Sequence, residues 1–139
     1  LVEYDADVTV IELNLETVRR LRAEGHKALY GDVLRPGTLE EAGIATAGSL
    51  ILSVEIEDAA ELIRQARVAN PSVRVLARCA HLREAPKLRN AGAKVVAAEA
   101  EVAIALAEVL KSAEDSESLA SAKREAMRRR LYEEGPAEG

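Results

Sequence analysis

Short apolar runs alternate with helical patterns through most of this chain, and that alternation constrains its fold more than any other feature. The apolar runs predict strands at residues 8–12, 27–30, 50–54, 73–78 and 95–98. Apolar residues at helical spacing predict helices between them, at residues 14–25, 36–42, 57–69, 82–90 and 101–111. Strands joined by helices form parallel sheets with right-handed crossovers. We therefore expect an α/β fold, a doubly wound parallel sheet with helices on both faces.

The chain has 139 residues, of which 48% are hydrophobic, and this suits a single domain with a real core. It holds three Tyr and neither Phe nor Trp, so small aliphatic side chains must fill that core. We assign residues 1–111 to the domain. From residue 112 the composition shifts to Ser, Glu, Lys and Arg, and we expect residues 112–139 to be a polar tail, either one weakly amphipathic helix or a disordered segment.

Charge and cysteine content exclude several classes of protein. The net charge of −5 argues against a nucleic-acid binder, which needs a basic face to replace the counterions of the phosphates. The single cysteine, Cys79, excludes a disulfide framework and favours a reducing compartment. The longest stretch without charge, residues 42–54, is far shorter than the roughly 20 apolar residues that a bilayer-spanning helix needs. We therefore expect a cytoplasmic location.

The first candidate site residues follow the first two expected strands. Glu12 ends the first apolar run, with Leu13 and Asn14 directly after it, and Gly31-Asp32-Val33 follows the second run. A carboxylate at such a strand end accepts hydrogen bonds from ribose hydroxyls, and a glycine there allows close approach of a base. Each feature alone also fits an ordinary surface acid or turn. Together, at the rim where the strands end, they favour a nucleotide ligand over those simpler interpretations.

A second group is expected at the ends of the next two strands. Ser53 and Val54 should end the third strand and Arg78 the fourth, so these residues should face the same rim. A guanidinium group there suits a phosphate or carboxylate, although a surface ion pair explains Arg78 equally well. Neither histidine has a second ligand at metal-binding spacing, and no catalytic set can be assembled. The sequence therefore predicts neither a metal site nor catalytic residues, and we expect a protein that is not an enzyme.

The helix expected at residues 101–111 is apolar around much of its circumference. Such a helix is buried both against its own sheet and against a partner. We therefore predict that it forms a homodimer interface, with intramolecular packing as the alternative. The basic cluster in the tail lies among acidic residues and is better explained as a solvated helix face.

The segments VTVIELNLETVRRLRAEGHKALYGDVLRPGTLEEAGI and SLILSVEIEDAAELIRQARVANPSVRVLARCAHLREAPKLRNAGAKVV resemble a known family over residues 1–111. It is the RCK or KTN regulatory domain, also called TrkA-N, of potassium channels, Trk uptake regulators and Kef-type cation:proton antiporters. The resemblance implies a cytosolic Rossmann-like domain that binds NAD(H), AMP, or ATP or ADP. It also implies control of potassium transport by a membrane channel or antiporter, fused or separate, at the inner face of the cell membrane.

By position, the resemblance assigns Glu12 to the ribose, Asp32 and Val33 to the adenine side, and Arg78 to the neighbourhood of the ligand. Val33 stands where the family commonly has Ala, and Leu15 where Pro often starts the helix. The family's first strand and its GxGxxG phosphate loop have no counterpart here, so nucleotide binding by this chain should be weak or absent.

The missing strand also bears on the fold, because it is central in the doubly wound order 3-2-1-4-5-6. Its loss would leave unpaired backbone groups in the middle of the sheet. We therefore expect the natural protein to carry residues upstream of Leu1, or another chain to supply a swapped strand. Residues 1–4 should then be the end of the helix that follows the missing strand.

Two other functions fit the residues. The chain could be the cofactor-binding half of an NAD-dependent oxidoreductase, although a dehydrogenase needs a substrate domain and only the polar tail follows residue 111. It could also be a dimerisation module that no longer binds a ligand.

Overall fold

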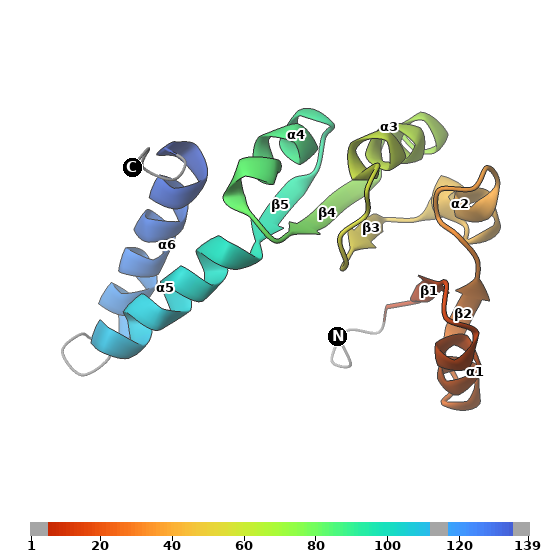
Figure 1. Ribbon diagram of the computed structural model, residues 1–139, viewed down its shortest axis with the longest axis horizontal. Helices are drawn as coiled ribbons and strands as arrows, with labels where there is room; N and C mark the ends of the chain where they lie inside the picture. Colours follow the sequence, from red (N-terminus) through yellow and green to blue (C-terminus); the bar gives the residue numbers. More distant parts are fainter. Residues whose placement is uncertain (1–5, 112–116, 135–139) are drawn as a thin grey trace. The chain divides into compact units, whose positions relative to one another are not determined.

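The computed structural model describes residues 6–111 and 117–134 (Figure 1). Its elements, in chain order, are β1 (Thr9–Glu12), α1 (Leu15–Ala23), β2 (Lys27–Tyr30), α2 (Thr38–Glu41), η1 (Ile44–Thr46), β3 (Ser49–Leu52), α3 (Ala59–Ala69), β4 (Arg74–Cys79), η2 (Leu82–Glu84), α4 (Ala85–Asn90), β5 (Lys94–Ala97), α5 (Ala98–Lys111) and α6 (Glu117–Glu134). Here η marks a 3₁₀ turn. Strands and helices alternate as far as α5, which confirms the α/β class.

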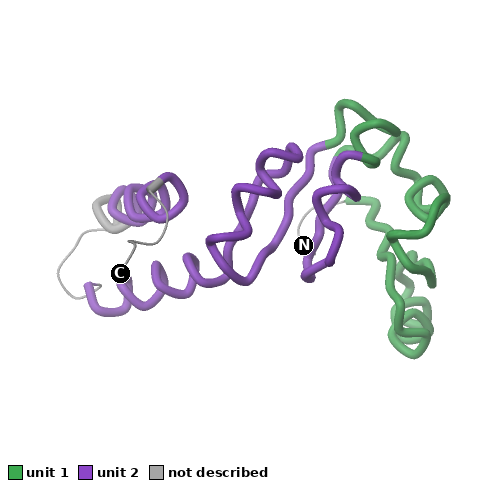
Figure 2. The backbone as a smooth tube through the Cα atoms, turned by 45° about the horizontal axis from the view of Figure 1, so that its top comes forward, with its two compact units in different colours: residues 1–48, 65–73 green, residues 49–64, 74–139 purple. Residues whose placement is uncertain are grey.

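The chain divides into two compact units, which Figure 2 distinguishes by colour. The first comprises residues 1–48 and 65–73 and holds the parallel pair β1-β2. The second comprises residues 49–64 and 74–139 and holds the parallel sheet β3-β4-β5. Residues 1–4, expected to be the end of a helix, lie outside the described part.

In the first unit, parallel pairing sets β1 and β2 in register, so that Glu12 stands beside Tyr30. The next residue, Gly31, donates its backbone N–H to the carbonyl of Glu12 at 3.1 Å. Helix α1 packs against both strands through Val18, which is fully buried. Asn14 caps this helix, because its Oδ1 accepts the N–H of Thr17 at 3.0 Å.

Asn70 ends α3 and holds the first unit together. It is the one buried polar side chain among the described residues, 6% exposed. Its Nδ2 donates to the carbonyls of Ile44 at 2.9 Å and Ala47 at 2.8 Å, and its Oδ1 accepts from the N–H and hydroxyl of Ser72. The two bonds from Nδ2 join the turn η1, which is 23 to 26 residues away in sequence, to the end of α3.

In the second unit, β4 lies between β3 and β5, and its residues Val75, Ala77 and Cys79 are buried. Helix α5 buries Ala100 and Ile104. Small aliphatic side chains fill this core, as the lack of Phe and Trp requires. Close packing of helix on sheet follows from the small size of these side chains.

Helix α6 lies against α5 in the same unit and is held by polar groups. Arg128 forms a two-pronged bond to the carboxylate of Glu101, with its Nε at 3.0 Å from Oε1 and an Nη at 2.7 Å from Oε2. The hydroxyl of Tyr132 accepts the N–H of Ala97 at 2.6 Å and donates to Glu101 at 3.2 Å. The described part of the tail is therefore helical and docked.

Several expected boundaries differ from the structure, and two of them lie next to candidate site residues or the loop after β4. Strand β3 ends at Leu52, so Ser53 and Val54 lie in the turn after it rather than at its end. The chain leaves the sheet early because the carboxylate of Glu55 bonds the N–H of Ala80, beyond the end of β4. Helix α5 begins at Ala98, three residues before the expected start, because Glu99 bonds the loop after β4.

Replacing Asn70 by Ala should destabilise the protein by about 2 to 4 kcal/mol, since two carbonyls lose their donor in a buried site. Urea unfolding followed by circular dichroism measures this change. Ser72→Ala, which removes one bond to the same side chain, is the control and should cost about 1 kcal/mol or less. Equal, small effects of the two substitutions would contradict the role of Asn70.

Acid should weaken the contact between α5 and α6. The bonds from Arg128 hold the pKa of Glu101 below its ordinary value, so the ionised carboxylate stabilises the folded state. That contribution is present above the ordinary carboxyl pKa and fades as the pH falls through the lowered one. Thermal unfolding should show Glu101→Gln less stable than the native chain at pH 7, with a smaller difference near pH 3. A difference that does not change with pH would contradict this.

Candidate functional site

Glu12 lies at the end of β1, and its side chain shapes the segment that follows. Glu12 is half-buried, and its Oε1 accepts the N–H of Asn14 at 2.9 Å, directly before α1. The other oxygen, Oε2, accepts no hydrogen bond from any residue that the structure describes. This carboxylate therefore keeps an acceptor for an outside hydroxyl. Leu13 and Asn14, the next two predicted residues, are both exposed.

The turn Gly31-Asp32-Val33 lies beside Glu12, at the end of β2, and all three residues are half-buried. The φ of Gly31 is not in the left-handed region, and an added Cβ would meet only Thr38, at 3.5 Å. The turn thus does not require glycine for its backbone. What glycine provides here is an open surface close to the main chain.

Asp32 builds this turn with both its side chain and its carbonyl. Its Oδ1 accepts the N–H of Leu34 at 2.9 Å, and its carbonyl accepts the hydroxyl of Thr38 at 2.8 Å and the N–H of Arg35 at 3.0 Å. The carboxylate thus shapes the turn itself, while the carbonyl of Asp32 ties the turn to Thr38 at the start of α2. The structure therefore joins the predicted residues of the first unit, Glu12 to Asn14 and Gly31 to Val33, in one place.

The three predicted residues of the second unit lie at the carboxyl ends of β3 and β4. Arg78 is exposed on β4 beside Val96 of β5 and forms neither a hydrogen bond nor an ion pair with any described residue. The surface ion pair that was its alternative explanation is therefore absent from residues 6–111 and 117–134. Ser53 and Val54, although outside the strand, are exposed in the turn that follows Leu52.

Two carboxylates that the sequence did not reveal as functional residues hold the loop after β4. The Oε1 of Glu55 accepts the N–H of Ala80 at 2.9 Å, and the Oε2 of Glu99 accepts that of Leu82 at 2.9 Å. Glu99 also donates its backbone N–H to the carbonyl of Ala80 at 3.0 Å. Acids just after a strand and in the first turn of a helix were the available signal, since both positions favour capping of backbone donors.

Burial raises the pKa of the Cys79 thiol, which lies just before this loop, and the nearby Glu84 and Glu55 raise it further. His81 lies 3.8 Å from Glu99, with both side chains about half exposed. In the described ranges, no three His, Cys, Asp or Glu side chains gather where they could share a metal ion.

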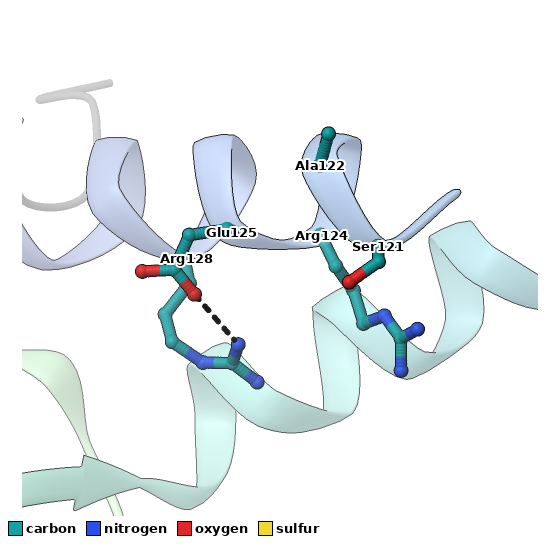
Figure 3. A pocket seen from close by; sticks show the side chains of 5 residues that line it. All are labelled: Ser121, Ala122, Arg124, Glu125 and Arg128. Atoms are coloured by element: carbon teal, nitrogen blue, oxygen red, sulfur yellow. Dashed lines mark ion pairs between the residues drawn. The ribbon is translucent and has the colours of Figure 1, made fainter. Parts of the chain in front are cut away.

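A surface hollow of about 530 Å³ is lined by side chains of α6 (Figure 3). Its lining residues are Ser121, Ala122, Arg124, Glu125 and Arg128. Both arginines are engaged, Arg124 with Glu108 at 2.7 Å and Arg128 with Glu101 and Glu125. The hollow is thus a consequence of how α6 docks, and the predicted ligand residues take no part in it.

None of the helices in the described ranges is both long enough and apolar enough to cross a bilayer.

Comparison with known proteins identifies relatives of this arrangement. The profile of the TrkA-N domain family matches residues 1–99. The TrkA-N domain of the inner membrane protein ybaL from Escherichia coli is 30% identical and superposes with a TM-score of 0.73, over 76% of this chain and 80% of that one.

More distant structures share the fold. The Kef CTD of Shewanella denitrificans, solved in an AMP-bound form, is 23% identical with a TM-score of 0.63, over 90% of this chain and 94% of that one. GsuK, solved with ADP, is 21% identical with a TM-score of 0.56, and the match covers 76% of this chain. This chain spans only 34% of the GsuK chain.

Proposed function

Because the chain belongs to the TrkA-N domain family, we propose that it is a nucleotide-sensing regulatory domain. It controls the transport of potassium, or of another monovalent cation, by a membrane channel or antiporter. The observation that carries this proposal is the placement of Glu12 beside Gly31 and Asp32 at the ends of two paired parallel strands. The 30% identical domain of an inner membrane protein supports a role at a membrane. The domain then works on the cytoplasmic side of the cell membrane, as a regulator rather than an enzyme.

The first unit fits the nucleoside part of a ligand. The Oε2 atom of Glu12 accepts a ribose hydroxyl, and its charge disfavours the extra phosphate of NADP. The base lies over Gly31, where the main chain is open, against the turn of Asp32 and Val33. NAD(H) is our first candidate, with AMP and ATP or ADP next, since the Kef CTD was solved with AMP and GsuK with ADP.

The sequence has no glycine before Gly25 and therefore no glycine-rich loop of the kind that binds a pyrophosphate. In the second unit, taken by itself, Arg78 is exposed and without an ion pair among the described residues, so it is our candidate there for binding an anionic group. Tests of binding therefore belong on the natural full-length protein.

We also propose that the domain is a homodimer and that α5 is its interface. The side chains of Val102, Leu106 and Leu110 lie at helical spacing on one face of α5 and are 59%, 61% and 85% exposed, while Ile104 is buried against the domain's own core. An apolar stripe of this kind is self-complementary across a two-fold axis. A dimer buries this apolar stripe away from water, whereas a monomer leaves it exposed.

Glu12→Gln should weaken NADH binding by the full-length protein about tenfold or more, because a bond between the ribose and a charged acceptor is lost. It should also reduce the preference for NADH over NADPH. Titration calorimetry with NADH, NADPH, AMP and ATP measures both effects. Gly31→Ala fits the turn without strain, so a loss of affinity in that variant reports approach of the base.

The outcome of this titration separates the functional alternatives. No heat with any nucleotide would leave the dimerisation module as the explanation. Hydride transfer to a substrate by the full-length protein would instead support the oxidoreductase.

Leu106→Asp should convert the dimer into a monomer at micromolar concentrations, because it places a charge in the middle of the apolar stripe. Sedimentation equilibrium measures the change. Val68→Asp, at a valine that is 84% exposed on α3, is the control and should leave the dimer intact. A native chain that is monomeric, or a dimer that survives Leu106→Asp, would contradict α5 as the interface.

A further inference from the structure

Helix α6 docks on α5 through one regular stripe of side chains. Arg124, Arg128 and Tyr132 are each four residues apart and therefore lie on the same face of α6. Their respective partners are Glu108, Glu101 and the backbone N–H of Ala97. Along the segment from the end of β5 into α5, these partners occur in the reverse order. Figure 3 shows both arginines extending from α6 toward α5. We call Glu108, Glu101 and the N–H of Ala97 the acidic flank.

The contact is polar and half exposed, unlike the core of the domain. None of the side chains described in α6, residues 121–133, is buried; Met127 and Leu131 are only half-buried. The side chains of the two ion pairs are between 31% and 43% exposed. Ion pairs with this exposure contribute little each and are screened by salt. The attachment of α6 is therefore much weaker than the attachment of α5, which buries Ala100 and Ile104.

Hydrogen bonds connect the acidic flank to the loop after Arg78. Tyr132 holds the N–H of Ala97, the last residue of β5, and Glu101 lies in the following turn of α5. Between them, Glu99 accepts the N–H of Leu82 and donates its own N–H to Ala80. One turn of α5 thus binds α6 on one side and the loop that follows Arg78 on the other.

We propose that the acidic flank is a docking surface with α6 as its exchangeable occupant, and that docking of α6 sets the position of the loop after Arg78. Release of α6 frees Glu101 and the N–H of Ala97, and the turn that carries Glu99 loses its support. The state of α6 and the affinity for ligand are then coupled. This second part rests on the proposed nucleotide-binding function, while the exchange of α6 does not.

Hydrogen exchange measured by mass spectrometry on the full-length protein tests the docking. Arg128→Glu should speed exchange of the α6 amides about tenfold or more, because a charge-assisted pair becomes a repulsive one. The double variant Glu101→Arg with Arg128→Glu restores the pair with reversed charges and should restore slow exchange. Arg129→Glu, the same charge change at a neighbouring exposed position, should leave exchange unaltered.

The exchange of α4 amides shows in the same experiment that each variant is folded. Equal effects of Arg128→Glu and Arg129→Glu, or no recovery in the double variant, would overturn the docking surface. Raising the salt concentration should speed exchange in α6 of the native chain and leave α4 unchanged.

Calorimetry with AMP and NADH tests the coupling. Arg128→Glu should give a nucleotide Kd that differs from that of the native chain. By linkage, the nucleotide should shift the docking equilibrium of α6 in the native chain by the same factor. An unaltered Kd, in a variant whose α6 exchanges faster, would overturn the coupling. If neither nucleotide binds the native chain, the proposed function fails, and the exchange data alone decide whether α6 is exchangeable.

Discussion

Parallel pairing of neighbouring strands is the constraint on which the rest of this structure depends. In a parallel pair both strands end at the same edge, so residues far apart in sequence meet there without any further device. The register of β1 and β2 sets Glu12 beside Tyr30, and the next residue, Gly31, bonds back to Glu12. The register of β3, β4 and β5 likewise brings Arg78 beside Val96. The candidate residues follow from where the strands stop.

Carboxylates at these strand ends bond to backbone N–H groups, and this is how the chain controls its loops. Glu12 bonds Asn14, Asp32 bonds Leu34, and Glu55 bonds Ala80. Each bond satisfies a donor that the end of a strand or the start of a helix leaves open. In the proposed function, an acid such as Glu12 both shapes a loop and accepts a hydrogen bond from the ligand. Ligand binding and loop conformation are then coupled, because the ligand acts on a group that already holds the backbone.

Periodicity predicted most elements of the fold, since local patterns determine them. The strand at residues 27–30, for example, was found from sequence alone. Periodicity did not find the end of β3, which depends on the bond between Glu55 and Ala80, 25 residues apart. The role of Asn70 was hidden for the same reason: Asn before Pro predicts the end of a helix, whereas its two carbonyl partners lie in another segment.

The docking of α6 was left open by the sequence because polar contacts between two helices leave no apolar pattern. Arg124, Arg128 and Tyr132 share a face, but so do many charged residues on helices that contact only water. What distinguishes this stripe is that two of its partners, Glu108 and Glu101, lie on α5, which can be recognised only when the two helices are seen together. An attachment made of such contacts responds to salt and pH, whereas the apolar core beneath α5 does not. The same chain therefore combines a fixed scaffold with a helix whose hold on it is weak enough to change.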